Sequence, residues 1–181
     1  NERVLAARLA DAKFFFDEDR KMKLEERGRK LTGVTFHRKL GTMARKQERV
    51  KKLAEALAAH ISPQDEELRQ TCIRAASLAK ADLLTGVVGE FPELQGVMGG
   101  EYAKHDGESE AVSQAVREQY IPRAIEGELP KTVAGQVLSL ADRLDTIAAF
   151  FPVGMVPTGS EAPFALRRHA TAIVRVLLEG K

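Results

Sequence analysis

Apolar residues recur at three- and four-residue spacing along almost the whole 181-residue chain, and this pattern constrains the fold more than any other feature. Such spacing puts apolar side chains on one face of an α-helix, whereas a half-buried strand needs alternation, and no alternating stretch is long enough to predict a sheet. We therefore expect an all-α bundle of about seven to eight helices. Hydrophobic residues make up 44% of the chain, enough for one sizeable core. A single domain over 1–181 is expected, in which a helical segment over 1–41 packs on 42–181.

Capping residues and helix breakers divide this pattern into separate helices. Thr42 and Thr132 are expected N-caps, and Ser62-Pro63-Gln64-Asp65 combines a cap, a first-turn proline and an acid. Prolines and glycines predict a loop over 152–163, and a short loop is expected around 34–36. The helices predicted from these signals cover approximately residues 4–19, 42–61, 62–82, a short helix from 92, then 112–120, 132–151 and 164–180.

The general composition indicates a cytoplasmic protein. Cys72 is the only cysteine, which excludes an internal disulfide and fits a reducing compartment, and we expect it to be a small core residue. No apolar run approaches the roughly 20 residues that cross a bilayer, so no membrane association is expected. The first residues contain neither an initiator Met nor a signal peptide, which suggests a fragment of a longer chain.

Charge is unevenly distributed along the sequence. Residues 1–60 contain sixteen Lys and Arg against nine Asp and Glu, whereas residues 61–131 contain seven against thirteen. A basic segment can attract phosphate groups, although solvated charges on a helix surface produce the same count. The charge alone leaves both interpretations open.

Two acidic residues, Asp82 and Asp142, stand within apolar helical stretches. A buried carboxylate is costly unless a cation, hydrogen-bond donors or a metal ion compensates its charge. Both stretches resemble the HD superfamily of metal-dependent phosphohydrolases, helical bundles in which a His-Asp pair and a late aspartate hold a divalent cation. Ala81 stands where the histidine of the pair would be, so the resemblance implies a degenerate site that holds no metal. Lys80 or Arg143 is then expected to occupy the former metal position.

The chain has one literal His-Asp dipeptide, His105-Asp106, which lies in the polar run 104–109. That composition favours an exposed turn, whereas a metal pair must project inward from an apolar helix. The other histidines, His37, His60 and His169, have no partner at ligand spacing. We therefore predict no metal-binding or catalytic histidine.

Five sequence segments extend the resemblance beyond a general HD fold. Together they resemble the β subunit of the bacterial tetrameric glycyl-tRNA synthetase, in the same order and across nearly the whole chain. These segments occupy residues 6–15, 36–41, 89–99, 102–107 and 163–168.

This resemblance implies an HD-like module that contacts tRNA and supports ATP-dependent glycyl-tRNA aminoacylation without catalysing it. Its implied partners are tRNA(Gly), the synthetase α subunit and the other domains of the β subunit. ATP and Mg²⁺ would serve the parent enzyme, and the fragment itself would need no cofactor. Two alternatives stay open: a metal-dependent HD phosphohydrolase, and a purely structural scaffold between domains.

If the chain grips tRNA, basic side chains on helix faces and after loops are the expected phosphate contacts. Five of the candidates cluster around the start of the second predicted helix, and two follow the predicted loop near the C-terminus. We predict no catalytic residue. The seven candidates for tRNA contact are Lys39, Arg45, Lys46, Arg49, Lys52, Arg167 and Arg168.

Overall fold

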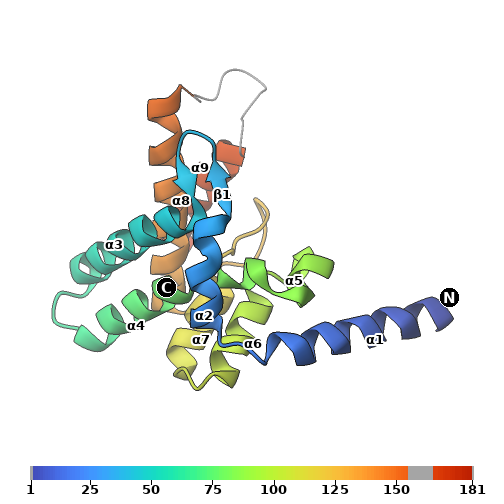
Figure 1. Ribbon diagram of the computed structural model, residues 1–181. Helices are drawn as coiled ribbons and strands as arrows, with labels where there is room; N and C mark the ends of the chain where they lie inside the picture. Colours follow the sequence, from blue (N-terminus) through green and yellow to red (C-terminus); the bar gives the residue numbers. More distant parts are fainter. Residues whose placement is uncertain (1, 155–164, 181) are drawn as a thin grey trace.

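The computed structural model describes residues 2–154 and 165–180, and in these ranges helices dominate (Figure 1). The all-α prediction is confirmed, with nine α-helices among the described residues and a single small hairpin. The α-helices are α1 (Glu2–Asp19), α2 (Leu24–Arg29), α3 (Met43–Ile61), α4 (Glu66–Leu78), α5 (Gly86–Glu90), α6 (Val97–His105), α7 (Glu110–Glu118), α8 (Val133–Phe150) and α9 (Leu166–Glu179). The remaining elements are the 3-10 helices η1 (Lys30–Gly33), η2 (Ala81–Leu84), η3 (Pro92–Leu94) and η4 (Phe151–Val153), and the strands β1 (Thr35–His37) and β2 (Gly41–Thr42).

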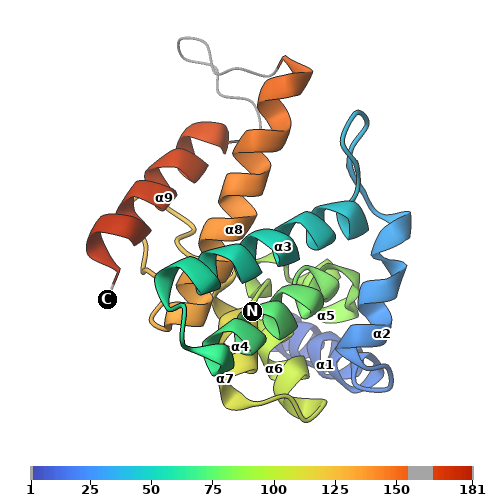
Figure 2. The ribbon, with the colours of Figure 1, turned by 90° about the vertical axis from the view of Figure 1, so that its left-hand side faces the viewer.

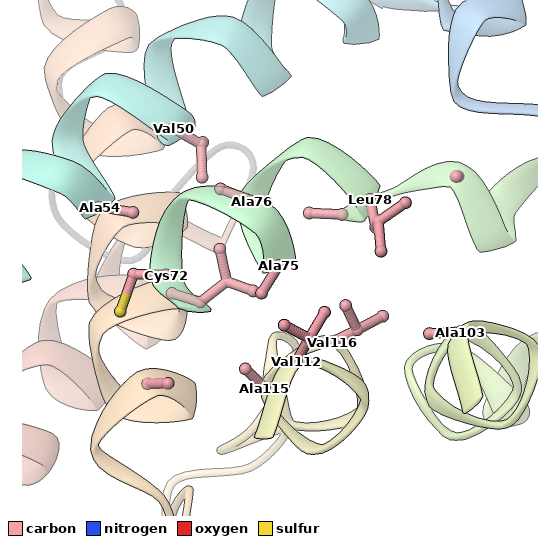
Figure 3. Packing of buried hydrophobic residues seen from close by; sticks show 14 of the residues in the cluster. Val50, Ala54, Cys72, Ala75, Ala76, Leu78, Ala103, Val112, Ala115 and Val116 are labelled. Atoms are coloured by element: carbon pink, nitrogen blue, oxygen red, sulfur yellow. The ribbon is translucent and has the colours of Figure 1, made fainter. Parts of the chain in front are cut away.

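The core forms where α4 lies between α3 and α7, with α8 packed against all three helices. Val50 and Ala54 of α3 lie beside Ala76 of α4, and Val112 and Val116 of α7 lie on the other side of α4 (Figure 3). Many of these positions hold small side chains, which let the helix backbones approach closely. None of the described helices is both long enough and apolar enough to cross a membrane.

Cap residues place the two longest core helices as the sequence predicted. The Thr42 hydroxyl accepts the Arg45 N–H at the start of α3, and the Thr132 hydroxyl accepts the Gly135 N–H at the start of α8. Helix α8 is deeply buried, as expected, and Cys72 is a fully buried core residue. The caps therefore fix the helices that carry most of the charged side chains discussed below.

Helix α1 projects from the rest of the molecule and is anchored at its C-terminal end (Figures 1 and 2). Its predicted apolar side is buried only toward that end, because Val4, Leu5 and Leu9 are exposed. The anchor is Asp19, whose carboxylate accepts the backbone N–H groups of residues 86 and 87 at 2.7 and 2.9 Å and the Tyr102 hydroxyl at 2.9 Å. This single buried carboxylate joins α1 to α5 and α6.

Several predicted boundaries were wrong. Asp65, not Ser62, caps α4, which therefore begins three residues later than the proline signal suggested. Helix α4 ends at Leu78 because Lys80 adopts a left-handed conformation with φ 67°, so Asp82 lies in the 3-10 turn η2 and not inside a long helix. The loop predicted around 34–36 overlaps strand β1 (Thr35–His37) of the hairpin β1–β2. Most of the loop predicted over 152–163, and the start of the last helix at Phe164, lie outside the described residues.

Candidate nucleic-acid interface and buried charge cluster

Four charged side chains meet in the interior between α3, the turn before η2, and α8. We call Lys46, Lys80, Asp142 and Asp145 the buried charge cluster. Lys46 Nζ lies 3.0 Å from Asp142 Oδ1 and 3.0 Å from Asp145 Oδ2, and it donates to the Thr146 hydroxyl at 2.8 Å. Lys80 Nζ lies 2.9 Å from Asp142 Oδ2. Each carboxylate therefore meets an ammonium group, as burial of a charge requires.

The local backbone explains how Lys80 reaches this position. Its left-handed conformation ends α4, and its N–H donates to the buried Gln119 amide oxygen at 3.1 Å. Its ammonium group also lies 3.9 Å from the centre of the Tyr120 ring, a cation–π contact that further compensates for lost hydration. A non-glycine residue in this conformation is uncommon and costs backbone energy. The surrounding contacts therefore hold Lys80 in place.

Asp82 lies next to the cluster and has different partners. Its carboxylate accepts the Gly96 N–H at 2.6 Å and the Tyr120 hydroxyl at 3.0 Å. Gly96 has φ +78°, and an added Cβ would lie 2.6 Å from the Arg117 carbonyl oxygen, so this donor position requires glycine. Burial raises the pKa of the Asp82 carboxyl, which the Gly96 N–H and Lys80 only partly oppose. Asp82 is thus a buried hydrogen-bond acceptor that ties η2 to residues 96 and 120.

Asp142 is ionised in this setting. Burial disfavours its charge, but the ammonium groups of Lys80 and Lys46 outweigh burial and hold the pKa of the carboxyl well below its usual range. Of the two residues expected beside the acids, Lys80 and Arg143, Lys80 forms the ion pair with Asp142. Arg143 instead donates to the carbonyl oxygens of Tyr120 and Pro122.

The buried charge cluster does not fit a divalent cation, because ammonium groups lie against both oxygens of Asp142. Ala81 contributes only a methyl group and is fully buried. Over residues 2–154 and 165–180, the structure contains no group of three or more His, Cys, Asp or Glu side chains that could hold a metal ion. The arrangement is that of a structural ion cluster.

The His105-Asp106 pair ties two helices together. The Asp106 carboxylate accepts the Leu24 N–H at 2.6 Å and so fixes the start of α2, while the His105 ring lies 3.3 Å from the guanidinium of Arg20. His169 of α9 lies 3.4 Å from Arg143, and burial, followed by the Arg143 charge, lowers the pKa of its imidazole to about 4.

The structure separates the seven predicted tRNA contacts into exposed and engaged residues. Lys39 and Arg45 are exposed at the hairpin and the first turn of α3, and Lys52 is exposed farther along that helix. Arg49 is half-buried and donates through Nε and Nη2 to Asp145 at 2.6 and 3.1 Å. Lys46 is only 3% exposed, so the expectation that it lies on the outer basic face is wrong.

Arg167 and Arg168 are exposed on the first turn of α9. In both ribbon views, the start of α9 and the hairpin lie toward the same end of the molecule as the last turns of α8 (Figures 1 and 2). Packing of the Phe36 ring 5.6 Å from the Phe150 ring holds the hairpin against α8. Arg45 and Arg167, which lie about 120 positions apart in the sequence, thus share one end of the fold.

Sequence reasoning missed three exposed basic residues beside these candidates: Arg29, Lys30 and Arg38. They belong to the excess of positive charge over residues 1–60, but they fall in a short helix, a 3-10 turn and a hairpin, where helical spacing gives no signal. Among the described residues, none of the three has a carboxylate within ion-pair distance. We call the exposed cations at this end, together with Lys52 farther along α3, the basic end: Arg29, Lys30, Arg38, Lys39, Arg45, Lys52, Arg167 and Arg168.

The whole chain, residues 1–181, matches the family model described as glycyl-tRNA synthetase beta subunit. It is similar to the glycine–tRNA ligase beta subunit of Bacillus subtilis, with 49% identity over 179 residues, and to that of Citrifermentans bemidjiense, with 51% identity over 179 residues. The same subunit of Phenylobacterium zucineum is 51% identical over 181 residues. These matches cover 99–100% of this chain but only 26–27% of each relative, so the chain spans about a quarter of their length.

Proposed function

The chain belongs to the family of glycyl-tRNA synthetase β subunits, and on this premise we propose that it binds tRNA(Gly) through its basic end. In this role the chain supports ATP-dependent aminoacylation of tRNA in the cytoplasm and does not catalyse the reaction. ATP and Mg²⁺ would be used by the synthetase α subunit, which we propose as a partner together with the rest of the β chain. The module is HD-like, with a degenerate metal site.

One observation carries the proposal: the basic end concentrates exposed cations that lack acidic partners. Lys39, Arg45 and Lys52 have no ion pair with any described carboxylate, whereas exposed Lys13 of α1 pairs with Asp17 at 2.6 Å. Unpaired cations at one end of a protein create a positive potential that attracts a polyanion. Contacts to phosphates position an RNA without reading its bases.

The buried charge cluster favours this function over phosphohydrolysis. A hydrolase of the HD type needs a cation-bound water as its nucleophile. Lys80 and Lys46 contact the carboxylate that would bind such a cation, and Ala81 provides no ligand atom. If the chain were only a structural scaffold, charge reversal at the basic end would not change tRNA affinity. Binding measurements therefore distinguish the scaffold from the RNA-binding function.

The experiment compares two charge-reversal doubles of equal net charge. In the first, Lys39→Glu and Arg168→Glu change the basic end; in the control, Lys13→Glu and Lys104→Glu change exposed lysines that already have acidic partners. The affinity of the 181-residue chain for tRNA(Gly) is measured by fluorescence anisotropy from 50 to 300 mM salt. The basic-end double should reduce the slope of log affinity against log salt by about 2, since each lost phosphate contact contributes nearly 1.

The control double should leave most of this slope intact. Equal weakening by both doubles would show that only net charge matters, and unchanged affinity in both would favour the scaffold. Either outcome would overturn the proposed function. Far-UV circular dichroism and thermal unfolding establish that all variants are folded.

A further inference from the structure

A cavity of about 860 Å³ lies between α2, η1 and the first two turns of α3. Its volume is within the ~300–1,000 Å³ range of small-molecule sites. Three arginines from two separate segments line it: Arg29, Arg45 and Arg49. A general contact between the basic end and an RNA backbone would need exposed cations but no hollow, so this open cavity lined by arginines offers room for a bound group.

Arg49 is held in place from behind. Asp145 binds its Nε at 2.6 Å and its Nη2 at 3.1 Å, a two-bond contact that fixes the guanidinium plane and leaves Nη1 uncommitted among the described residues. Lys46 Nζ lies 3.0 Å from the same carboxylate and shares its negative charge. Arg49 therefore keeps positive charge and a fixed donor for a ligand in the cavity.

The other walls add features that suit a phosphate with a polar group attached. Arg29 and Arg45 are exposed and have no described carboxylate within ion-pair distance. Ala44 lies in the first turn of α3, where the helix dipole favours an anion, while the Met43 and Arg45 N–H groups are already bonded to Val34 and Thr42. The acid Glu25 is bound by Arg74 at 3.1 Å, whereas Glu48 is exposed and can accept hydrogen bonds from a ligand.

We propose that this cavity binds one nucleotide, with its phosphate at the three arginines and a ribose hydroxyl donating to Glu48. Guanidinium groups match a phosphate because their planar forks donate two parallel hydrogen bonds. This inference rests on the proposed function in that the nucleotide belongs to the bound RNA; a free nucleotide offers the same chemistry from a second source. The cavity would add to backbone attraction a site that holds one residue of the RNA.

Two matched pairs of variants test the cavity. Ala44→Trp fills it without changing charge, and its control is Ala59→Trp, on the exposed part of the same helix and outside the cavity lining. Arg45→Gln removes a lining charge, and Lys13→Gln removes an equal charge on α1, outside both the cavity lining and the basic end. Thr32→Trp, at an exposed lining position, is a second filling variant in case Ala44→Trp lowers the melting temperature.

The probes are inorganic phosphate, AMP and tRNA(Gly), with affinities of the 181-residue chain measured by calorimetry and anisotropy. AMP should bind more tightly than phosphate and compete with tRNA. Ala44→Trp, Thr32→Trp and Arg45→Gln should each weaken AMP and tRNA binding about tenfold, while the two controls change either affinity less than threefold. AMP binding lost on filling while tRNA affinity persists would support the site with a free nucleotide as its ligand.

Filling variants that bind AMP and tRNA like the unmodified chain would overturn the nucleotide site. Equal affinities for phosphate and AMP would overturn it as well, because the sugar and base would then contribute nothing. The proposed function has its own test. It is overturned if charge reversal at Lys39 and Arg168 has no specific effect on tRNA affinity, whatever the results for the filling variants.

Discussion

Arg45 and Lys46 are neighbours in sequence, yet they belong to two regions with opposite physical roles. Arg45 is exposed in the basic end, without a described acidic partner. Lys46 is buried and meets Asp142, Asp145 and Thr146. Because adjacent helical residues point about 100° apart, one step along α3 moves a cation from solvent into the core. The number of positive charges therefore says little about tRNA binding until the structure shows which side chains are exposed and which are buried.

The largest expected effect comes from breaking the buried charge cluster. Asp142→Ala removes the carboxylate that Lys46 and Lys80 both contact. A buried charge left unpaired typically lowers the free energy of unfolding by about 3–5 kcal/mol. We expect the free energy of unfolding, measured by urea titration, to fall by about that amount. Glu55→Ala, which removes an exposed carboxylate on α3, should cost less than about 0.5 kcal/mol. Similar values for both variants would contradict the assignment of Asp142 as an ionised core residue.

Replacing Lys46 and Arg45 by the same residue sharpens the comparison. Lys46→Met should lower the free energy of unfolding by about 3 kcal/mol, because both Asp142 and Asp145 lose a buried cation. It should leave the tRNA affinity of the folded protein within about twofold. Arg45→Met should do the reverse, with stability nearly unchanged and weaker tRNA binding. Urea titration and anisotropy on both variants measure the two quantities, and a loss of both in each variant would break the distinction.

Acid should weaken the contact between α8 and α9 through His169. Its folded-state pKa is about 4, against 6.5 for the ordinary imidazole, so between these pH values the unfolded chain binds more protons. Stability should fall as pH decreases from 6.5 to 4, by about 2 kcal/mol after allowance for the partly exposed ring. His169→Gln should flatten this part of the stability profile, whereas His60→Gln, at an exposed position, should not. A profile unchanged by His169→Gln would rule out this residue as the source.

The smallest effect is expected at Arg49, which binds Asp145 of the buried charge cluster and also lines the cavity beside the basic end. Arg49→Lys keeps the charge but replaces the two-bond contact to Asp145 by a single donor. The free energy of unfolding should fall by only about 1 kcal/mol, since the side chain is 38% exposed. Affinity for tRNA should fall about threefold through loss of the fixed fork. Full retention of affinity would place Arg49 entirely with the cluster.

Helix α3 also shows how much the sequence could predict. The Thr42 cap and the helical period were sufficient to place the helix and part of its buried face. Of the apolar residues at helical spacing, Val50 is buried and Leu53 and Leu57 pack against the core, whereas Ile61 is 49% exposed. Hydrophobicity alone gave no signal for the buried Lys46 and Gln47 on the same helix.

Other features depend on contacts between distant segments and left no local signal. Lys80 turns left-handed because Gln119, Tyr120 and Asp142 hold it, and all three lie at least 39 positions away in the sequence. The hairpin strands are too short for alternation to be visible. By contrast, the signal for a cation beside the acids was local. Ala81 supplies no ligand atom, so Lys80 or Arg143 was expected there, and Lys80 is the residue that pairs with Asp142.

Asp19 has a geometric consequence for the direction of α1. The exposed part of the helix, over residues 2–11, is about 15 Å long at 1.5 Å per residue. A tilt of roughly 10° at its base would swing the far end by about 3 Å, a distance comparable to a hydrogen bond. The direction of α1, and the position at which it presents Val4, Leu5 and Leu9, thus depend on the bonds of the Asp19 carboxylate to α2, α5 and α6 together with the packing of Phe15 and Phe16.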